Sequence, residues 1–532
     1  MIKIKEQTAA LKKIWYSFLN FVRSHLLLAV GIAVFIWLIY GGQAFNNYYY
    51  IDKEALVNEP GSFYNWDEIG RFGLILMKKV FGMSWYNPYL AGIMLLLTLW
   101  VAAMEAGSLF HAIEPRLTAP ILFIFILLFL VYPTYVEQFL FQFQAFEVAA
   151  AMLFLLLSDH YLVQSLQEKN IIAFSMSIPL VVIAFGIYQS MIPLQLCLYL
   201  SVFLMLTYAK NGERKMIIST VRYFALHFVV TIGVYGLISS FFQKSDYLSG
   251  QVVWQKDSYD AAISRIRLYF NFVTKRLEVG YTLTYDLCCL IALAALLILL
   301  IKRRLNAVWY GLALLGVATS PFFLTIVTGE VQPYRAQLTL PLACGVLWLF
   351  GIHILSEELK HKRWRQTART FLTIAGCVMI FLNVTPMMRL FYTRDVIGKA
   401  DELTAAMIAN EIGSIPSAYD GKPVIFVGTR KPATNNACYE LGLTQYGCST
   451  YTVYSVFEME QAIMPYYFFS SRRIMGFFRT LGIQSFQAPS DASIMPSAYE
   501  DGRNMPIWPL EGSVMEFDEY IIVKLGELEL LQ

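Results

Sequence analysis

The chain has 532 residues, of which 57% are hydrophobic and only 15% are charged, and its mean hydropathy is +0.53. A soluble protein carries about 25% charged residues, so this composition excludes an ordinary soluble domain and indicates a polytopic membrane protein. The formal net charge of +3 is too small to indicate a nucleic-acid partner.

The first 25 residues are charged and amphipathic, and no small-residue cleavage site follows the apolar stretch after them. We therefore interpret that stretch as a retained first span. Later apolar stretches are long enough, or nearly so, to cross about 30 Å of hydrocarbon. Because the stretches are continuous rather than alternating, they predict helices and not barrel strands. About eleven transmembrane helices are expected, near 26–42, 87–109, 119–134, 144–164, 171–187, 190–208, 218–242, 283–301, 307–328, 336–355 and 370–389.

Basic residues in the short loops predict the direction of the spans. With eleven spans, four basic clusters fall on one side, which we assign to the cytoplasm together with the N-terminus. These clusters are Lys3, Lys5, Lys12, Lys13 and Arg23; Lys210, Arg214 and Lys215; Lys302, Arg303 and Arg304; and Lys360, Lys362, Arg363, Arg365 and Arg369. The loop at 43–86 and everything after residue 389 are then extracytoplasmic. A basic stretch in a later outer loop, "AAISRIRLYFNFVTKRLEVG", counts against the rule and is interpreted as a helix on the membrane surface.

The C-terminal segment, residues 390–532, differs in character from the transmembrane domain expected for residues 1–389. "DELTAAMIANEIGSI" predicts an amphipathic helix and "SRRIMGFFRTLGI" a second helix. "KPVIFVG" and "EYIIVKL" predict buried strands. We therefore expect a small extracytoplasmic α/β domain. An oxidising exterior allows a disulfide between its cysteines, Cys438 and Cys448, but their spacing leaves the pairing open.

Several kinds of chemistry have no motif in the chain. There is no phosphate-binding glycine loop, dinucleotide fingerprint, HExxH zinc motif or GxSxG nucleophile elbow. The six histidines are scattered, which argues against a histidine metal site. No cofactor and no metal ligand set are predicted; a divalent metal is left open, with no support from the sequence.

Polar side chains recur in the turns that the expected topology places on the outer face. The first outer loop, with its stretch "YYYIDKEALVNEPGSFYNWDEIGRFG", holds five acidic residues and Arg71. Three later turns add Glu137 in "YPTYVEQFLFQFQAFE", Tyr188 and Gln189 in "YQSMIP", and Glu330, Tyr334 and Arg335 in "TGEVQPYRAQLTLP". We therefore expect one outer-face cavity that contains Asp52, Asp67, Glu68, Arg71, Glu137, Gln189 and Arg335.

Simpler explanations compete with a functional one. Acidic residues in a loop are usually solvated, and interfacial aromatic residues form a belt without binding a ligand. Asp67 fits the N-cap of an amphipathic helix over "EIGRFGLILMKKVFG", with Lys78 and Lys79 on the polar side of that helix. Arg71 fits a contact with a phospholipid headgroup.

Three motifs in order resemble those of a known family. Asp52 precedes "WDEIGRF" in the first outer loop, "PTYVEQFLFQF" opens the fourth span, and the Tyr188–Gln189 pair precedes a further span. In this pattern the chain resembles the glucosyltransferase II family of GT-C class membrane proteins, which decorate bacterial O-antigens and other surface polysaccharides. The C-terminal segment with "KPVIFVG" is also similar.

The resemblance implies a multi-pass protein of the bacterial cytoplasmic membrane, in contact with membrane lipids. It implies transfer of a sugar, glucose, from a polyprenyl-phosphate donor to an acceptor surface glycan, with a catalytic base in the first outer loop. Family members often carry two adjacent acids where this chain has Asp52 followed by Lys53. The base is therefore left between Asp52, as first choice, and the pair Asp67 and Glu68.

Elementary chemistry describes what such a site needs. A carboxylate takes the proton of the acceptor hydroxyl, and a cation neutralises the departing phosphate, so one base and one cation suffice for an inverting transferase. Arg335 is expected at the donor phosphate and Arg71 beside the carboxylates. Glu137, Tyr188, Gln189 and Tyr334 are expected to bind substrate.

Two other functions compete with glycosyl transfer. A glycan polymerase or ligase uses the same kind of donor but usually has a larger late outer loop than the one at 329–335. A flippase or transporter of lipid-linked sugars predicts internal symmetry or broken spans, and neither is clear in the sequence.

Overall fold

The computed structural model describes residues 2–47, 49–50, 52–83, 85–210, 214–242, 252–255, 257–302, 307–359, 361–439, 455–458 and 464–528. The chain forms two compact units. The first unit contains residues 1–46, 64–83 and 87–388, and the second contains residues 47–63, 84–86 and 389–532. The first outer loop is therefore shared between the units, each of which is described separately below.

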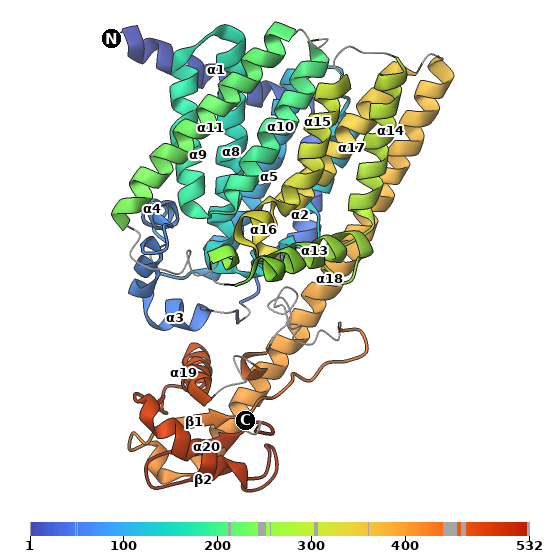
Figure 1. Cartoon of the computed structure of the whole chain (residues 1–532). Coiled ribbons are helices and arrows are strands. Elements are labelled where there is room, and N and C mark those ends of the chain that lie inside the picture. The colour runs from blue at the N-terminus through green and yellow to red at the C-terminus, as the bar shows by residue number, and fades with distance from the viewer. Residues whose placement is uncertain are drawn as a thin grey trace. The chain divides into compact units, whose positions relative to one another are not determined.

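The first unit is helical, because its sequence is a series of apolar stretches that must satisfy their backbone hydrogen bonds internally. Its helices are α1 (Ile2–Ser24), α2 (Leu26–Ala44), α4 (Phe72–Val80), α5 (Pro88–Ile113), α6 (Ala119–Leu130), α7 (Tyr135–Leu140), α8 (Gln142–Glu168), α9 (Ile171–Ile187), α10 (Met191–Ala209), α11 (Arg214–Phe242), α13 (Tyr259–Lys275), α14 (Thr284–Ile301), α15 (Ala307–Thr319), α16 (Phe323–Thr328), α17 (Thr339–Glu358) and the first part of α18 (Lys362–Gly413) (Figure 1).

A helix lies at each of the expected spans, although the count of eleven transmembrane helices is not confirmed. Within the described residues, nine helices are long and apolar enough to cross a membrane. The other two apolar helices, α6 with 12 residues and α9 with 17, are shorter. The chain is accordingly a helical membrane protein.

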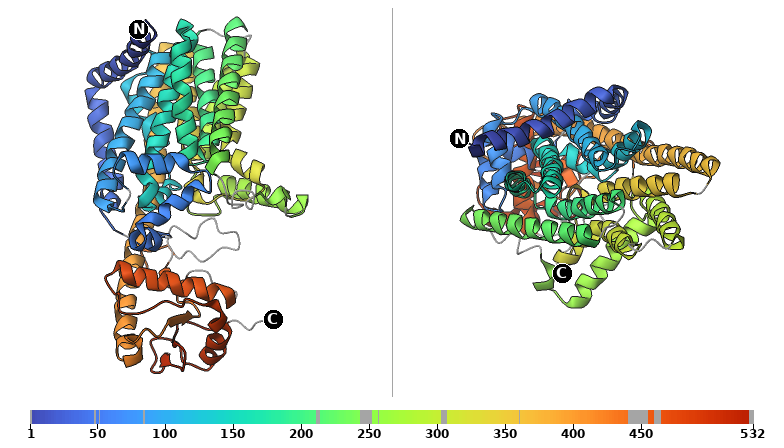
Figure 2. Two further views of the ribbon diagram at one scale, coloured as in Figure 1. Left: turned by 90° about the vertical axis from the view of Figure 1, so that its left-hand side faces the viewer. Right: turned by 90° about the horizontal axis from the view of Figure 1, so that it is seen from above.

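Helices α8 and α17 form the interior of the first unit. Helix α8 packs against α5 and α9, and α17 packs against α6 and α14. Their apolar segments are 83% and 94% buried, whereas that of α11 is only 28% buried. Helix α1 lies at a steep angle to the bundle axis (Figure 2), which fits its charged, amphipathic sequence.

The basic clusters gather at one end of the first unit. Helices α10, α14 and α17 end, and α11, α15 and α18 begin, at the end where α1 lies (Figure 1). Helices α4, α13 and α16 lie at the opposite end, which we call the outer-turn end. The stretch expected to form a surface helix is α13. The direction of the spans across a membrane stays a prediction.

The second unit is built around a three-stranded sheet. Its strands are β1 (Val424–Val427), β2 (Val514–Glu516) and β3 (Ile521–Lys524), in the order β1-β3-β2. Strand β1 is parallel to β3, and β2 is antiparallel to it. The helices are α3 (Lys53–Asn58), α19 (Met464–Thr480), α20 (Met495–Arg503) and the last part of α18.

Both faces of this sheet are covered, because β1 and β3 are hydrophobic without alternation. Val424 and Phe426 pack with residues of α18 and α19, whereas Ile425 and Val427 pack with residues of α20. The strands expected from "KPVIFVG" and "EYIIVKL" are thus present, as is the helix expected from "SRRIMGFFRTLGI".

Three local expectations were wrong. Helix α4 begins at Phe72 and not near Asp67, so Asp67 is not its N-cap; Asp67 ends a preceding 3-10 helix, Pro60–Asp67. Lys78 is buried rather than on a polar face. The amphipathic helix expected after residue 400 is not separate, because α18 runs on from the last apolar segment. The Cys438–Cys448 disulfide stays a prediction, since Cys448 lies outside the described residues.

Candidate functional site

The turn between α16 and α17 places Arg335 against Glu137 of α7. The carboxylate of Glu137 accepts hydrogen bonds from the Arg335 guanidinium, at 2.5 Å, and from the Arg335 backbone N–H, at 3.2 Å. Glu137 is completely buried, and a buried carboxylate is costly unless it is paired. The two hydrogen bonds therefore stabilise the buried carboxylate of Glu137 and also fix the backbone of the turn at Arg335. Arg335 remains 20% exposed and lies over the ring of Phe141.

A second arginine of the outer-turn end is held by aromatic rings. The guanidinium carbon of Arg71 lies 4.9 Å from the ring centroid of Tyr188 and 5.9 Å from that of Trp66. Its Nη1 donates a hydrogen bond to the side-chain oxygen of Gln144 at 3.3 Å. A guanidinium over aromatic faces keeps its charge and is fixed in direction.

Tyr188 is in contact with Arg71 and lies near Arg335. It is buried and lies within electrostatic range of Arg335, Arg71 and Glu137. Four turns that are distant in the sequence thus bring two guanidinium groups and one carboxylate around a single tyrosine. This group of residues, Arg71, Glu137, Tyr188 and Arg335, is called the outer-turn cluster below.

The Gly-Arg pair in "WDEIGRF" explains how Arg71 reaches the cluster. Gly70 has a φ of 78°, a conformation that most L-residues avoid. A Cβ atom at this position would lie 2.8 Å from the Ser239 hydroxyl, so the turn also requires the absence of a side chain. The neighbouring Gln189 donates from its side-chain nitrogen to the carbonyl of Ile69 at 2.8 Å. Gln189 therefore positions the segment that carries Arg71.

Tyr334 forms hydrogen bonds with the loop that follows α13. Its hydroxyl donates to Glu278 at 2.7 Å and accepts from the backbone N–H of Gly280 at 3.2 Å. Burial raises the pKa of Glu278 above its ordinary value. Tyr334 is fully buried, which fits a residue that shapes the turn beside Arg335. Its expected contact with substrate stays a prediction.

Asp67 and Glu68 lie beside the cluster in sequence but have different surroundings. Asp67 lines an open groove of about 560 Å³, whose other residues are apolar side chains of α4, α9 and α11 together with Lys79. Glu68 is partly exposed. The assignment of either residue as base or orienting group stays a prediction.

Asp52 belongs to the second unit. Its carboxylate lies 3.7 Å from a guanidinium nitrogen of Arg473 in α19, and its side chain is 46% exposed. Asp52 has a φ of 68°, a left-handed conformation that Asp tolerates better than most residues. Whether Asp52 shares a cavity with Asp67 and Arg335 stays a prediction.

Lys53, the residue that follows Asp52, is buried in the second unit. Its ammonium group donates to the backbone oxygen of Asn47 at 2.9 Å and to the side-chain oxygen of Asn47 at 2.6 Å. Burial, and then the positive charge of Arg394, lowers the pKa of Lys53 to about 7. Lys53 is therefore a structural residue of this unit.

Two contacts were not expected from the sequence. Lys78 forms a buried ion pair with Glu147 at 2.8 Å, which explains why a lysine faces the interior. Arg473 pairs with Asp52 and, at 3.8 Å, with Glu54. The sequence shows two adjacent arginines in "SRRIMGFF", but adjacent arginines on an amphipathic helix usually lie on a solvated face. In the described part of the chain, no group of three or more metal-binding side chains was found.

Comparison with known proteins adds one finding. The family model of the glucosyl transferase GtrII matches residues 41–352, more than half of the chain and a range that contains every expected site residue. Most of the second unit, including α19, lies outside that range. No curated protein and no solved structure gave a significant match.

Proposed function

The chain belongs to the glucosyl transferase GtrII family, and from this membership we propose that it moves glucose from a polyprenyl-phosphate donor to a surface glycan. The reaction is assigned to the outer face of the bacterial cytoplasmic membrane. The family match supports membrane glucosyl transfer as the general activity, and the donor, the acceptor and the face are our proposal.

The outer-turn cluster is the observation that carries the proposal. A polyprenyl-phosphate sugar has a phosphate at the membrane surface, and its leaving group is an anion. Arg335 and Arg71 both lie within electrostatic range of the buried Tyr188. Guanidinium groups bind phosphate oxygens in pairs of hydrogen bonds, and an interior with few waters strengthens that attraction. Arg335 keeps part of its surface exposed to receive such a group.

The bond changes are those of an inverting displacement. The acceptor hydroxyl oxygen attacks the anomeric carbon while the bond from that carbon to the phosphate oxygen breaks. A carboxylate takes the hydroxyl proton, and the electron pair of the broken bond leaves with polyprenyl phosphate. Because phosphate is a stable anion, no general acid is required. Asp52 is our first choice for the base and Asp67 the second, with Glu68 orienting the acceptor.

A transfer assay tests the proposal. The purified full-length protein in lipid nanodiscs is given glucosyl polyprenyl phosphate and envelope glycan from cells that lack the gene. Glucose should appear on the glycan together with an equal amount of free polyprenyl phosphate. A parallel reaction with a nucleotide-linked glucose should give none. Transfer from the nucleotide donor alone, or no transfer from either donor, would overturn the proposal.

A further inference from the structure

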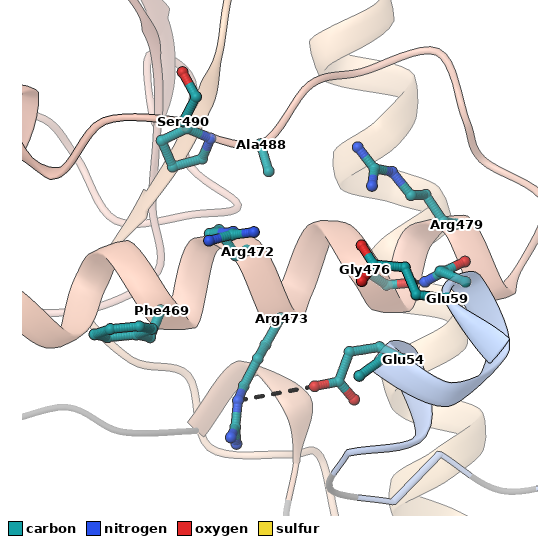
Figure 3. Close-up of a pocket in the computed structure, with 12 residues that line it drawn as sticks. Glu54, Glu59, Phe469, Arg472, Arg473, Gly476, Arg479, Ala488 and Ser490 are labelled. Carbon is teal, nitrogen blue, oxygen red and sulfur yellow. Dashed lines mark hydrogen bonds and ion pairs between the residues drawn. The ribbon is translucent and has the colours of Figure 1, made fainter. Parts of the chain in front are cut away.

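A pocket in the second unit carries side chains that the proposed reaction does not use. It has a volume of about 450 Å³, within the usual range of small-molecule sites, about 300–1,000 Å³. One wall is α3 and the following residue, and the other is α19 with the loop at 488–490. Figure 3 shows Glu54 and Glu59 on the first wall and Arg472, Arg473 and Arg479 along the second.

The two walls meet because α19 has a glycine at the contact. A Cβ atom at Gly476 would lie 2.9 Å from two side-chain carbons of Glu54. The backbone oxygen of Gly476 also accepts a hydrogen bond from the side-chain nitrogen of Asn58, at 3.0 Å. Glu54 is then held on both sides, by the hydroxyl of Tyr49 at 2.8 Å and by Arg473 at 3.8 Å. The pocket is therefore a built feature of the fold, not a gap between loose segments.

The arginines of the pocket are not equivalent. Arg473 is half-buried and is already paired with Asp52 and Glu54. Arg472 and Arg479 are exposed, and no carboxylate of the described residues forms an ion pair with either. Arg472 lies over the ring of Phe468. Two guanidinium groups on one wall, about two helical turns apart, thus have no anionic partner among the described residues.

The other side chains of the pocket indicate what kind of anion fits. A site for a simple phosphate gains nothing from carboxylates, which repel it. A sugar presents hydroxyl groups, which donate to carboxylates such as Glu59 and accept from guanidinium groups. The ring of Phe469 is 52% exposed at the pocket, and an exposed aromatic face suits the apolar face of a sugar ring.

We propose that this pocket binds an acidic sugar unit, one that carries a carboxylate or a phosphate group, of the acceptor glycan. Arg472 and Arg479 bind its anionic group, Glu59 binds its hydroxyls, and Arg473 is held in place by Asp52 and Glu54. The inference rests on the proposed function where it identifies the bound sugar as part of the acceptor glycan. The binding of an acidic sugar does not depend on that function. It assigns the recognition of glycan to α19, which lies beyond the range that the family model matches.

Binding measurements with the full-length protein in nanodiscs test the pocket. The probes are methyl β-D-glucuronide and methyl β-D-glucoside, which differ only in the carboxylate, and glucose 6-phosphate as the phosphate-bearing probe. We expect one or both acidic probes to bind and the neutral glucoside to bind at least about tenfold more weakly, since charge-assisted contacts are lost. Glucoside binding equal to that of the acidic probes, or no binding of any probe, would overturn the proposal.

Variants locate the binding. Arg472→Gln and Arg479→Gln should each weaken the binding of the acidic probe at least about tenfold. Because both residues are exposed, the variants should keep the fold. Arg503→Gln, at an exposed arginine of α20, is the matched control and should change nothing. Unchanged affinity in the Arg472 and Arg479 variants would exclude this pocket. Equal competition by inorganic phosphate would reveal a general anion site and would also overturn the sugar assignment.

The transfer assay separates this inference from the proposed function. If the function holds and the inference fails, glucose transfer occurs and is unaffected by Arg479→Gln. If the function fails and the inference holds, the acidic probe still binds to the pocket although no glucose is transferred. If both hold, Arg479→Gln should raise the KM for the acceptor glycan and leave the KM for the lipid donor unchanged.

Discussion

The outer-turn cluster and the pocket of the second unit both combine arginine with carboxylate, but they differ in how completely the charges are satisfied. In the cluster, Glu137 is fully buried and receives two hydrogen bonds from Arg335. In the pocket, Glu59 is exposed, and Arg472 and Arg479 are paired with no carboxylate of the described residues. A closed, paired site is fixed before substrate arrives, whereas an open site with spare charge is suited to bind a mobile partner.

The difference has a physical origin. A charge near the membrane core must be paired, because removing it from water costs several kcal/mol. A charge at the surface of the second unit has water as an alternative partner, and a surface ion pair is worth about 0–1 kcal/mol. The first unit therefore offers preorganised cations, and the second offers accessible carboxylates and cations. Each prediction below tests one side of this contrast.

The largest effect is expected on the rate of transfer. Asp52→Asn should lower the turnover in the nanodisc assay by about 10²- to 10⁴-fold, because a general base is removed while shape and size are kept. Asn also tolerates the left-handed conformation of this residue. Asp67→Asn is tested in parallel, as the second choice for the base. Asp518→Asn, at an exposed acid of the second unit, is the control and should be neutral.

The parallel comparison decides between the two acids. A loss confined to Asp67→Asn would move the base to the groove of the first unit. Near-normal turnover in both variants would remove the assignment of a base from the first outer loop.

The next effect is on the stability of the first unit. Arg335→Gln leaves the buried carboxylate of Glu137 without its cation, which costs about 3–5 kcal/mol for a buried pair. We expect a lower thermal midpoint in nanodiscs and a low yield of folded protein. The double variant Arg335→Gln/Glu137→Gln should recover much of the stability but no activity. Arg276→Gln breaks a more exposed pair with Asp286 in the same unit and is the control, for which a small change is expected.

The stability of α3 should depend on pH. Burial raises the pKa of Glu54 from 4.5 to about 7, against the opposing effects of Arg473 and Tyr49. The folded state therefore holds this proton more tightly than the unfolded state. The resulting stability is fully present below about pH 4.5 and is lost as the pH rises through 7. A shift of this size corresponds to about 3 kcal/mol at most.

Lys53 gives the opposite trend in the next pH window. Its pKa is lowered from 10.5 to about 7 by burial and by Arg394, against the attraction of Glu402. The unfolded state then binds the proton more tightly, so stability rises between about pH 7 and 10.5. Amides 53–58, corrected for their intrinsic exchange rates, should therefore exchange fastest near pH 7. Glu54→Gln should remove only the pH dependence of exchange below about pH 7. Glu59→Gln should leave the whole pH dependence unchanged.

The sequence was most informative where one property dominates. Long apolar stretches predicted the spans, and unbroken hydrophobic stretches such as "VIFV" predicted buried strands. The end of the last helix was not predicted correctly, because α18 continues after residue 389 although its composition changes there. Propensity for a helix does not end where hydrophobicity ends.

Pairings between distant residues could not be predicted in the same way. Arg335 and Glu137 were selected from separate turns as substrate-binding residues, but only the fold shows that they bind each other. Arg473 was missed because its contact with Glu54 depends on Gly476, which lets two helices approach closely. Sequence alone shows which charges exist and not which of them remain available.

The smallest effect expected is that of Asp52→Asn on stability, and it decides how the rate loss is interpreted. Asp52 makes an exposed contact with Arg473 at 3.7 Å and gives no capping hydrogen bond to α3. Its loss should therefore lower the free energy of unfolding by less than about 1 kcal/mol. Hydrogen exchange in α3 and α19 measures this, with Arg473→Gln as the reference. Arg473→Gln should have the larger effect, because it also removes the partner of the mostly buried Glu54. If Asp52→Asn opened α3 as much as Arg473→Gln does, the loss of transfer would reflect a disrupted unit, and Asp52 would be a structural residue rather than the base.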